Sequence, residues 1–227
     1  MESQVRGGTR WKRFALVMVP SVAATAAIGV GLAQGALAAS FSVSGVDFKV
    51  TAQQLDGHNL LQYGSVATGK TLDGKDAAHP VVVSGFSDAT ITKMCQSVVQ
   101  PLPFGLGNVT MTLKAGQGDQ KIEASNLYLD VSDLSTDATF TNLDIGVAAG
   151  EGKRDKDSGK VVTSIQPGAD GKTPGGNQYG FAQRADRAVL DNIEQRAWAT
   201  TAGSFKLPGL SLKLAMNGPE CPPASKY

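Results

Sequence analysis

The sequence predicts a mainly β fold of the α+β class: an antiparallel sheet or sandwich with one C-terminal amphipathic helix packed on it. Apolar and polar residues alternate in several short segments, which places one face of each strand on the core and the other in water. Glycine is frequent, at 27 of 227 residues, as expected for a chain with many turns. One segment near the C-terminus has the apolar spacing of an amphipathic helix.

The segments with strand character are residues 41–44, 46–50, 81–83, 109–113, 127–131, 161–165 and 210–216. The last is the clearest, because its apolar residues alternate strictly with small or polar ones; they are Leu210, Leu212, Leu214 and Met216. Since strict alternation gives a strand one buried face, we expect these four side chains to lie on the core.

The predicted helix spans residues 181–199, between Gly180 and Gly203. Its apolar stripe consists of Phe181, Ala185, Ala188, Val189, Ile193 and Ala197. The charges outside the stripe are mixed in sign, whereas helices that lie on membranes carry mostly basic residues. We therefore expect this helix to pack across the sheet.

Residues 1–38 have the pattern of an export signal. Four basic residues precede an apolar stretch at residues 14–32, and Ala36-Leu37-Ala38 matches a signal peptidase site. Cleavage after Ala38 leaves residues 39–227 as a single secreted β-rich domain. The alternative is that the apolar stretch, which approaches the length of a membrane span, stays as an N-terminal anchor.

The charge of the predicted mature domain excludes a nucleic-acid partner held by a basic surface. The full chain has 21 Lys and Arg against 20 Asp and Glu, and residues 1–38 contain four of the bases and one of the acids. This leaves 17 bases against 19 acids, so no excess of positive charge remains to release counterions from a phosphate backbone.

Cys95 and Cys221 are the only cysteines, and both follow the export signal. In an oxidising compartment an even pair is most simply a disulfide. Such a bond would join the C-terminal tail to the middle of the domain. The alternative of a catalytic thiol at Cys221 is disfavoured, because the residue lies between Glu220 and two prolines with no base nearby.

Residues 146–180 form an excursion rich in glycine and charge, with two mobile turns expected on either side of the short strand at 161–165. Within it, Asp155, Asp157 and Gly159 match the start of a calcium loop, but the third oxygen ligand and the closing Glu are missing. No metal site and no cofactor are therefore expected.

Any Ser–His mechanism must use His58 or His79, because the chain has no other histidine. Ser87 follows the strand at 81–83 in the sequence Gly-Phe-Ser-Asp-Ala, which differs from the nucleophile motif G-x-S-x-G only in its last residue. An imidazole within hydrogen-bond reach would activate this hydroxyl. Ser65, near His58 in the sequence, is a second candidate.

Three observations favour a surface turn at Ser87 instead. Both histidines precede it, whereas α/β hydrolases have the order Ser, Asp, His. Residues 89–94 predict a strand where that fold has a helix, and the chain lacks βαβ alternation. On this interpretation His58 is also a turn residue, and His79 with Pro80 starts a strand.

The competing function is lipid binding without turnover. Aliphatic strands and one amphipathic helix can enclose an apolar cavity, and the near absence of catalytic clusters fits this function better. A structural role at the cell surface is also compatible with the sequence.

As a whole, the chain resembles small secreted actinobacterial proteins described as cholesterol esterases. The resemblance covers nearly the full length, and the matching segments are Trp11-Lys-Arg-Phe14, Phe41-Ser-Val-Ser-Gly45, Ser204-Phe-Lys-Leu-Pro-Gly-Leu-Ser-Leu-Lys-Leu214 and the tail with Cys221. It implies hydrolysis of a sterol ester, an apolar substrate met at a lipid surface. In that mechanism Ser87 attacks the ester carbonyl, His58 or His79 is the base, and backbone N–H groups near Gly85 or Asp88 bind the oxyanion.

Overall fold

The computed structural model describes residues 43–168 and 174–226. The predicted export signal (1–38) lies outside the described residues, as do residues 169–173 of the second predicted turn of the excursion (168–176). So does the first half of the predicted strand at 41–44; in the second half, Val43 forms an isolated bridge with Gly69. Within the described ranges, no helix is long and apolar enough to cross a membrane.

The fold is mainly β and antiparallel, as predicted. The four long strands are β1 (Phe48–Lys70), β2 (Asp76–Thr92), β5 (Ile122–Thr141) and β9 (Phe181–Thr201). The shorter strands are β3 (Met94–Pro101), β4 (Asn108–Ala115), β6 (Asp144–Ala148), β7 (Lys153–Arg154), β8 (Val161–Thr163), β10 (Ser204–Lys206) and β11 (Ser211–Met216). Single 3-10 turns lie at η1 (Pro103–Gly105), η2 (Ala149–Glu151) and η3 (Ala224–Lys226).

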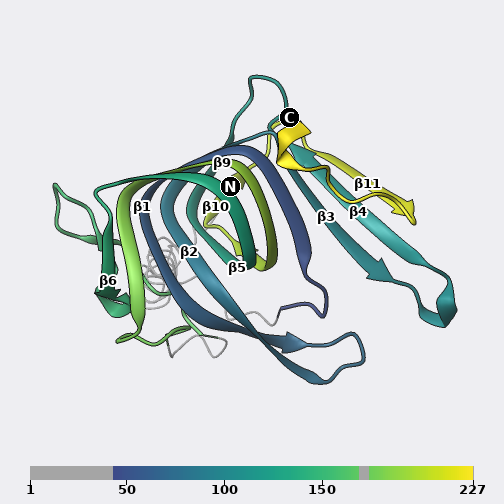
Figure 1. Ribbon diagram of the computed structural model, residues 1–227, viewed down its shortest axis with the longest axis horizontal. Helices are drawn as coiled ribbons and strands as arrows, with labels where there is room; N and C mark the ends of the chain where they lie inside the picture. Colours follow the sequence, from purple (N-terminus) through teal and green to yellow (C-terminus); the bar gives the residue numbers. More distant parts are fainter. Residues whose placement is uncertain (1–42, 169–173, 227) are drawn as a thin grey trace, which may run out of the picture. The chain divides into compact units, whose positions relative to one another are not determined.

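The four long strands pair in a closed cycle, which we call the closed sheet. β1 pairs with β2, β2 with β5, β5 with β9, and β9 again with β1, all antiparallel. Figure 1 shows these strands curling around a common interior. Closure pairs the edges that an open sheet would leave unpaired. From β1 a second branch continues through β3 and β4 to β11, and we call these three strands the side sheet.

Asparagines in the left-handed region lie within three of the long strands. Asn59, Asn126 and Asn192 have φ values of 54°, 46° and 53°. Asparagine adopts this region at less cost than most residues, because its short polar side chain can hydrogen-bond locally. A left-handed residue within a strand interrupts the regular pleat and bends it. We infer that these bends help strands of 17 to 23 residues to curl and close.

The interior of the closed sheet is narrow and filled by small residues. The interior width of such a sheet grows with strand number, so four strands leave little space. On β9, Ala185, Ala188 and Ala197 are completely buried in this interior. On β1, a Cβ atom at Gly57 would lie 2.4 Å from the ring of Phe86, so this glycine makes room for the aromatic side chain. One cavity in this interior, lined by residues such as Leu55 and Leu190, measures about 30 Å³, room for about one water molecule. Among the described residues this interior cavity is therefore too small for a lipid.

The prediction of a helix at residues 181–199 is wrong, because this segment is strand β9. Its buried residues are spaced by both two and three positions; they are Ala182, Ala185, Ala188, Leu190, Ile193, Gln195, Ala197 and Ala199. Asn192, where the strand bends, lies between Leu190 and Ile193, which are three positions apart. Buried residues three positions apart are also typical of an amphipathic helix, which explains the wrong prediction. The alanines, which favour helix locally, are required here by the narrow interior.

The strands predicted at 109–113 and 210–216 are present as β4 and β11, but the expected burial of their apolar face is wrong for β11. Leu212, Leu214 and Met216 are 61%, 72% and 60% exposed. β11 is the last strand of the side sheet and its apolar residues have no second layer over them within the described residues. The alternation therefore predicted the strand correctly and its environment incorrectly.

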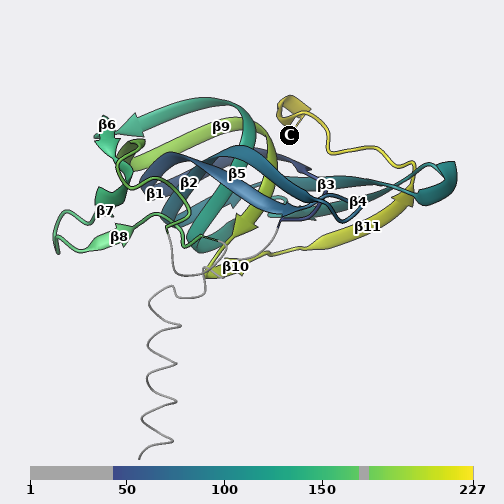
Figure 2. The ribbon, with the colours of Figure 1, turned by 90° about the horizontal axis from the view of Figure 1, so that it is seen from below.

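The described part of the excursion at 146–180 packs on the outer face of the closed sheet. The backbone N–H of Gln166 donates to the hydroxyl of Tyr63 at 2.9 Å, and the Thr163 hydroxyl donates to the carbonyl of Asn59 at 2.7 Å. Figure 2 shows β7 and β8 beside β1 and β2. This packing buries a second apolar cluster, which includes Tyr63 and is separate from the interior cluster.

Asp155 has a structural role in the turn between β7 and β8. Its carboxylate accepts hydrogen bonds from the backbone N–H of Ser158 at 2.8 Å and from the Ser158 hydroxyl at 2.7 Å. The bonds from Ser158 hold the pKa of Asp155 below its ordinary value. Asparagine and aspartate commonly stabilise turns in this way. In the described part of the chain, no group of three or more His, Cys, Asp or Glu residues is arranged to bind a metal ion.

Asp130 on β5 makes the stability of the fold depend on pH. Burial raises the pKa of this carboxyl group to about 6, and among the described residues none donates a hydrogen bond to it. In the unfolded chain it titrates near its ordinary value, so between about pH 4 and 6 the folded state binds more protons. Stability contributed by the protonated form is therefore complete below about pH 4 and is lost as pH rises through about 6.

We expect Asp130→Asn to raise the free energy of unfolding by about 2 kcal/mol at pH 8, because a neutral amide avoids the burial of a charge. At pH 4 the substitution should have little effect. Urea unfolding of both chains from pH 4 to pH 8 measures this difference. If the two chains differed in free energy of unfolding by the same amount at every pH in this range, the titration of Asp130 would be contradicted.

Candidate functional site

The structure brings Ser87 and His58 to the same carboxylate. His58 on β1 pairs directly with Asp88 on β2, and its Nδ1 lies 2.7 Å from Oδ1 of Asp88. The hydroxyl of Ser87 donates to the other oxygen, Oδ2, at 2.7 Å. The Nδ2 of Asn59 donates to Oγ of Ser87 at 3.0 Å. Ser87, Asp88 and His58 thus form a hydrogen-bonded chain on the surface of the closed sheet.

This order differs from that of a serine hydrolase. In a catalytic triad the imidazole lies between the hydroxyl and the carboxylate, so that it can take the proton. Here Asp88 lies between Ser87 and His58, and its side chain is 59% exposed. The expected turn at Ser87 is also wrong, because β2 continues through this residue to Thr92. Neither cavity described in this structure is lined by Ser87 or His58.

His58 lies in a charged row across three strands rather than in the predicted turn. Its neighbours in the register are Asp88 on β2 and Arg187 on β9. Arg187 binds Asp56 with two hydrogen bonds of 2.7 Å, and these hold the pKa of the Asp56 carboxyl below its ordinary value. The row therefore pairs Asp88 with His58 and Asp56 with Arg187 across the strands, and polar pairs of this kind are common on exposed sheet faces.

The structure does not bring His79 to Ser87. Eight residues of β2 separate them, about 26 Å along an extended strand. The ring of His79 stacks on Trp198, with 3.5 Å between ring centroids and 10° between planes. The predicted strand start at His79 and Pro80 is wrong, since both lie inside β2, where Pro80 pairs with Val66. His79 thus has a packing partner remote from the serine.

Ser65 belongs to β1, and its hydroxyl donates to the carbonyl of Gly175 in the excursion. Gly176 forms an isolated bridge with the same residue. Ser65 therefore fixes the end of the excursion against β1, and no histidine is among its partners in the described part of the chain.

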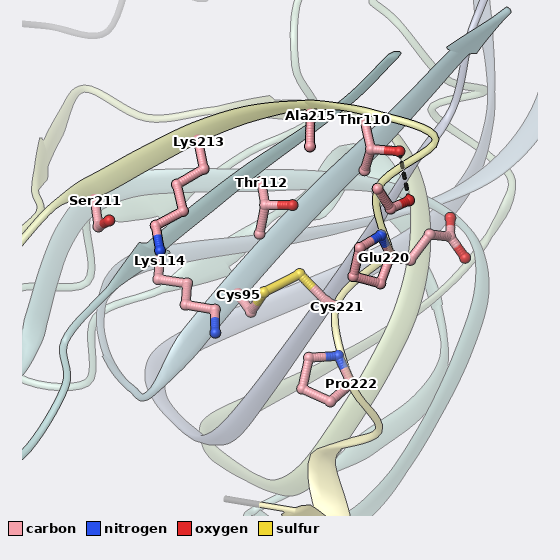
Figure 3. Close-up of a pocket in the computed structure, with 12 residues that line it drawn as sticks. Cys95, Thr110, Thr112, Lys114, Ser211, Lys213, Ala215, Glu220, Cys221 and Pro222 are labelled. Carbon is pink, nitrogen blue, oxygen red and sulfur yellow. Dashed lines mark hydrogen bonds between the residues drawn. A yellow bond between two sulfur atoms is a disulfide. The ribbon is translucent and has the colours of Figure 1, made fainter. Parts of the chain in front are cut away.

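A groove of about 430 Å³ lies between the side sheet and the C-terminal tail. Figure 3 shows its floor of residues from β3, β4 and β11 and its wall, residues 218–222. We call it the tail groove. The lining residues are Cys95, Thr110, Thr112, Lys114, Ser211, Lys213, Ala215, Gly218, Pro219, Glu220, Cys221 and Pro222. The volume is within the range of about 300–1,000 Å³ that is typical of small-molecule sites.

The wall of the tail groove is fixed by a disulfide and by hydrogen bonds. Cys95 on β3 is bonded to Cys221, which confirms the predicted pair. The N–H of Cys221 donates to the buried hydroxyl of Ser97 at 3.0 Å, and the hydroxyl of Thr110 donates to the carbonyl of Gly218 at 2.8 Å. The tail is therefore held at a constant distance from the floor.

The charges of the tail groove are distributed unevenly. Lys114 and Lys213 line one end, near Ser211, whereas Ala215 and Thr110 pair at the other. Neither lysine has a carboxylate partner among the described residues. Glu220, on the wall, is paired with Arg196 at 3.4 Å. The groove thus joins a lining of methyl, methylene and disulfide groups to two cationic groups that are free to bind an anion.

Sequence reasoning missed the tail groove. Two features of the sequence could have indicated the groove. One is the set of polar residues in the strand at 210–216, which we interpreted as the face exposed to solvent, and the other is the cysteine in the C-terminal tail. Only the register of β11 on β4 places Lys213 diagonal to Lys114, and only the path of the tail covers that face.

No curated protein and no solved structure matches this chain significantly. One sequence family matches residues 44–222, a range that begins just before β1 and ends just after the second cysteine of the disulfide. That range contains the closed sheet, the side sheet and all the lining residues of the tail groove. Because the match covers well over half of the chain, the protein belongs to DUF6230, a family of unknown function.

Proposed function

We propose that this protein is exported and binds a single-chain anionic lipid, such as a fatty acid, in the tail groove without chemical turnover. The observation that supports this most is the pair of lysines, Lys114 and Lys213, at one end of a groove with a largely apolar lining. A carboxylate head would accept charge-assisted hydrogen bonds from these lysines. The acyl chain would lie along the floor toward Ala215, where its burial from water is favourable.

The size of the groove favours one acyl chain. At about 30 Å³ for each water-sized group, 430 Å³ holds about 14 such groups, comparable with a chain of that many carbons. A complete cholesteryl ester contains a sterol ring system as well as an acyl chain and exceeds this volume. The product of ester hydrolysis therefore fits the groove better than the intact sterol ester expected from the sequence.

Export is part of the proposal. It is supported by the signal-like residues 1–38 and by the disulfide, which persists in oxidising compartments and is rare in the cytosol. An extracellular or cell-surface location would bring the tail groove into contact with lipids outside the cytoplasm.

Titration of the full-length protein with myristate in a calorimeter tests the proposal. We expect Lys114→Gln with Lys213→Gln to weaken binding by about tenfold or more, since hydrogen bonds to charged groups contribute about 1.5–3 kcal/mol. The matched control is Lys121→Gln with Lys160→Gln, because both control lysines lie outside the groove. Absence of myristate binding, or equal weakening by both pairs, would contradict an anion site at Lys114 and Lys213.

Sterol-ester hydrolysis at Ser87 is the second candidate. The chain of hydrogen bonds from Ser87 to Asp88 to His58 supports it, together with the resemblance of the sequence. In this reaction Oγ of Ser87 attacks the ester carbonyl and its proton passes to Asp88, which His58 holds in place by a hydrogen bond. The proton then goes to the departing sterol oxygen, and water releases the fatty acid from Ser87.

A fluorophosphonate probe distinguishes the two candidates. If the protein is a sterol esterase, we expect the probe to label one serine. Ser87→Ala should then abolish both labelling and hydrolysis of cholesteryl oleate, and the control Ser125→Ala should retain both. His58→Ala should lower the rate without removing the serine. An unlabelled protein that binds myristate would leave lipid binding as the function and exclude hydrolysis at Ser87.

A further inference from the structure

The side sheet has an uncharged face on the side opposite the tail groove. Residues paired across neighbouring strands point to the same side of a sheet. The register therefore places seven apolar side chains on one face: Val98 of β3, Val109, Met111 and Leu113 of β4, and Leu212, Leu214 and Met216 of β11. The other positions of this face are Gln96 and Gln100 and, toward the core, the buried pair Met94 and Ala115. We call this surface the apolar face.

The loop between β3 and β4 extends the apolar face. Residues 102–107, which we call the tip loop, contain no charged residue. Phe104 is 96% exposed and Leu106 is 63% exposed. Phe104 has a φ of 59°, a left-handed conformation that is strained for an aromatic residue. Figure 2 shows β3, β4 and β11 side by side, leading toward this loop.

We propose that the apolar face and the tip loop dock on the surface of a lipid bilayer, with Phe104 inserted among the acyl chains. The surface contains no charged residue, so it suits zwitterionic as well as anionic lipid. The lysines of the tail groove point to the opposite side of the same strands. This inference goes beyond the proposed lipid binding, because it concerns a different face of the side sheet.

A second copy of the chain fits this surface less well than lipid does. At roughly 150–200 Å² for each fully exposed large side chain, the five most exposed members present about 500–700 Å²; they are Phe104, Leu106, Leu212, Leu214 and Met216. A stable dimer of standard size buries about 800 Å² on each partner. A patch of this kind, with an aromatic residue on a protruding loop, is large enough for insertion into a lipid interface.

The length of chain before the described residues is compatible with this docking. In the alternative where the apolar stretch at 14–32 stays as an anchor, residues 33–42 connect it to the first described residue. These ten residues span at most about 35 Å when extended. An anchored chain would therefore keep residue 43 within about 35 Å of a membrane.

Quenching by brominated phosphatidylcholine vesicles tests the docking in the full-length protein. We expect the fluorescence of Phe104→Trp to shift to shorter wavelength and to be quenched. The matched control is Phe181→Trp, which is also exposed but lies on β9 outside the apolar face, and it should show neither change. The unsubstituted chain supplies the background signal of Trp11 and Trp198.

Adding Leu214→Ser to Phe104→Trp should raise the lipid concentration needed for half-quenching by about tenfold, since Leu214 would lose its contact with lipid. Ile145→Ser, at an exposed site elsewhere, should leave it unchanged. Docking is overturned if the Phe104→Trp variant is not quenched, or if it and the Phe181→Trp control are quenched equally.

A second copy of the chain gives a different result in the same experiment. In the absence of vesicles, the fluorescence of the Phe104→Trp variant could shift to shorter wavelength as the protein concentration rises, with dimers seen in sedimentation. That result would show that the surface binds a second copy of the chain, and docking on lipid would be overturned. Combining Phe104→Trp with Lys114→Gln and Lys213→Gln should leave the quenching unchanged. Failure of the docking is therefore distinguishable from failure of lipid binding in the tail groove.

Discussion

Replacing Cys95 and Cys221 together with alanine should lower the free energy of unfolding by about 5 kcal/mol. The bond joins residues 126 positions apart, and the chain-entropy treatment gives this value for a loop of that length. The expected fall in melting temperature is roughly 10–20 °C for a domain of this size. Calorimetry and urea unfolding of the two chains measure both quantities.

The same double substitution should also impair the tail groove while the closed sheet remains folded. Its wall would be held only by the hydrogen bonds of Ser97 and Thr110, so we expect myristate binding to weaken at temperatures where circular dichroism still shows the native sheet. Conversely, the pair Lys114→Gln and Lys213→Gln should weaken binding without changing the melting temperature. A loss of less than about 1 kcal/mol on removal of the disulfide would show that the tail contributes little to the fold.

Asp186→Ala should destabilise the protein by about 3–5 kcal/mol, because it leaves a buried lysine without its partner. Asp186 on β9 binds Lys153 of the excursion at 2.5 Å, also contacts Lys156, and accepts a hydrogen bond from Asn142 at 2.6 Å. Both Lys153 and Asp186 are largely shielded from water. Burial alone would raise the pKa of Asp186, but the bonds from these lysines and from Asn142 lower it well below its ordinary value.

The matched control for Asp186→Ala is Asp76→Ala, which removes an exposed ion pair with Lys70 and should change stability by less than about 1 kcal/mol. The contribution of Asp186 should be complete above about pH 4, its unfolded pKa, and should decline as pH falls toward its folded pKa. Urea unfolding of both variants at pH 7 and pH 3 gives the comparison. Equal effects of the two substitutions at pH 7 would contradict a structural role for the buried pair.

The local features of the fold could be predicted from the sequence. Alternation located strands at 109–113, 127–131 and 210–216, because a strand with two different faces imposes a period of two on its residues, and a short apolar run located the strand at 81–83. The disulfide could be predicted because the chain has only two cysteines, both after an export signal. These inferences depend on neighbours in the sequence or on residue counts, and the fold does not alter them.

The candidate site could be predicted only in part. Ser87 and His58 both hydrogen-bond to Asp88, so the structure does bring them together. The sequence shows that Asp88 follows Ser87, but it did not indicate that this carboxylate lies between the serine and the histidine. His79 was an equal candidate in the sequence and lies against Trp198 instead. The register in which β1 pairs with β2 decides which histidine lies near Ser87. This register cannot be read from the spacing of the residues in the sequence.

By itself, the sequence determined that this is a β-rich chain with an export-like leader and one cysteine pair, since periodicity and composition record the local preferences of the backbone. The tertiary structure alone decided that residues 181–199 are a strand, because only closure of a four-stranded sheet requires alanine along a narrow interior. It also decided that the apolar side of β11 faces outward. An alternating pattern shows that a strand has two unlike faces, but whether another layer covers one of them depends on the packing of distant segments.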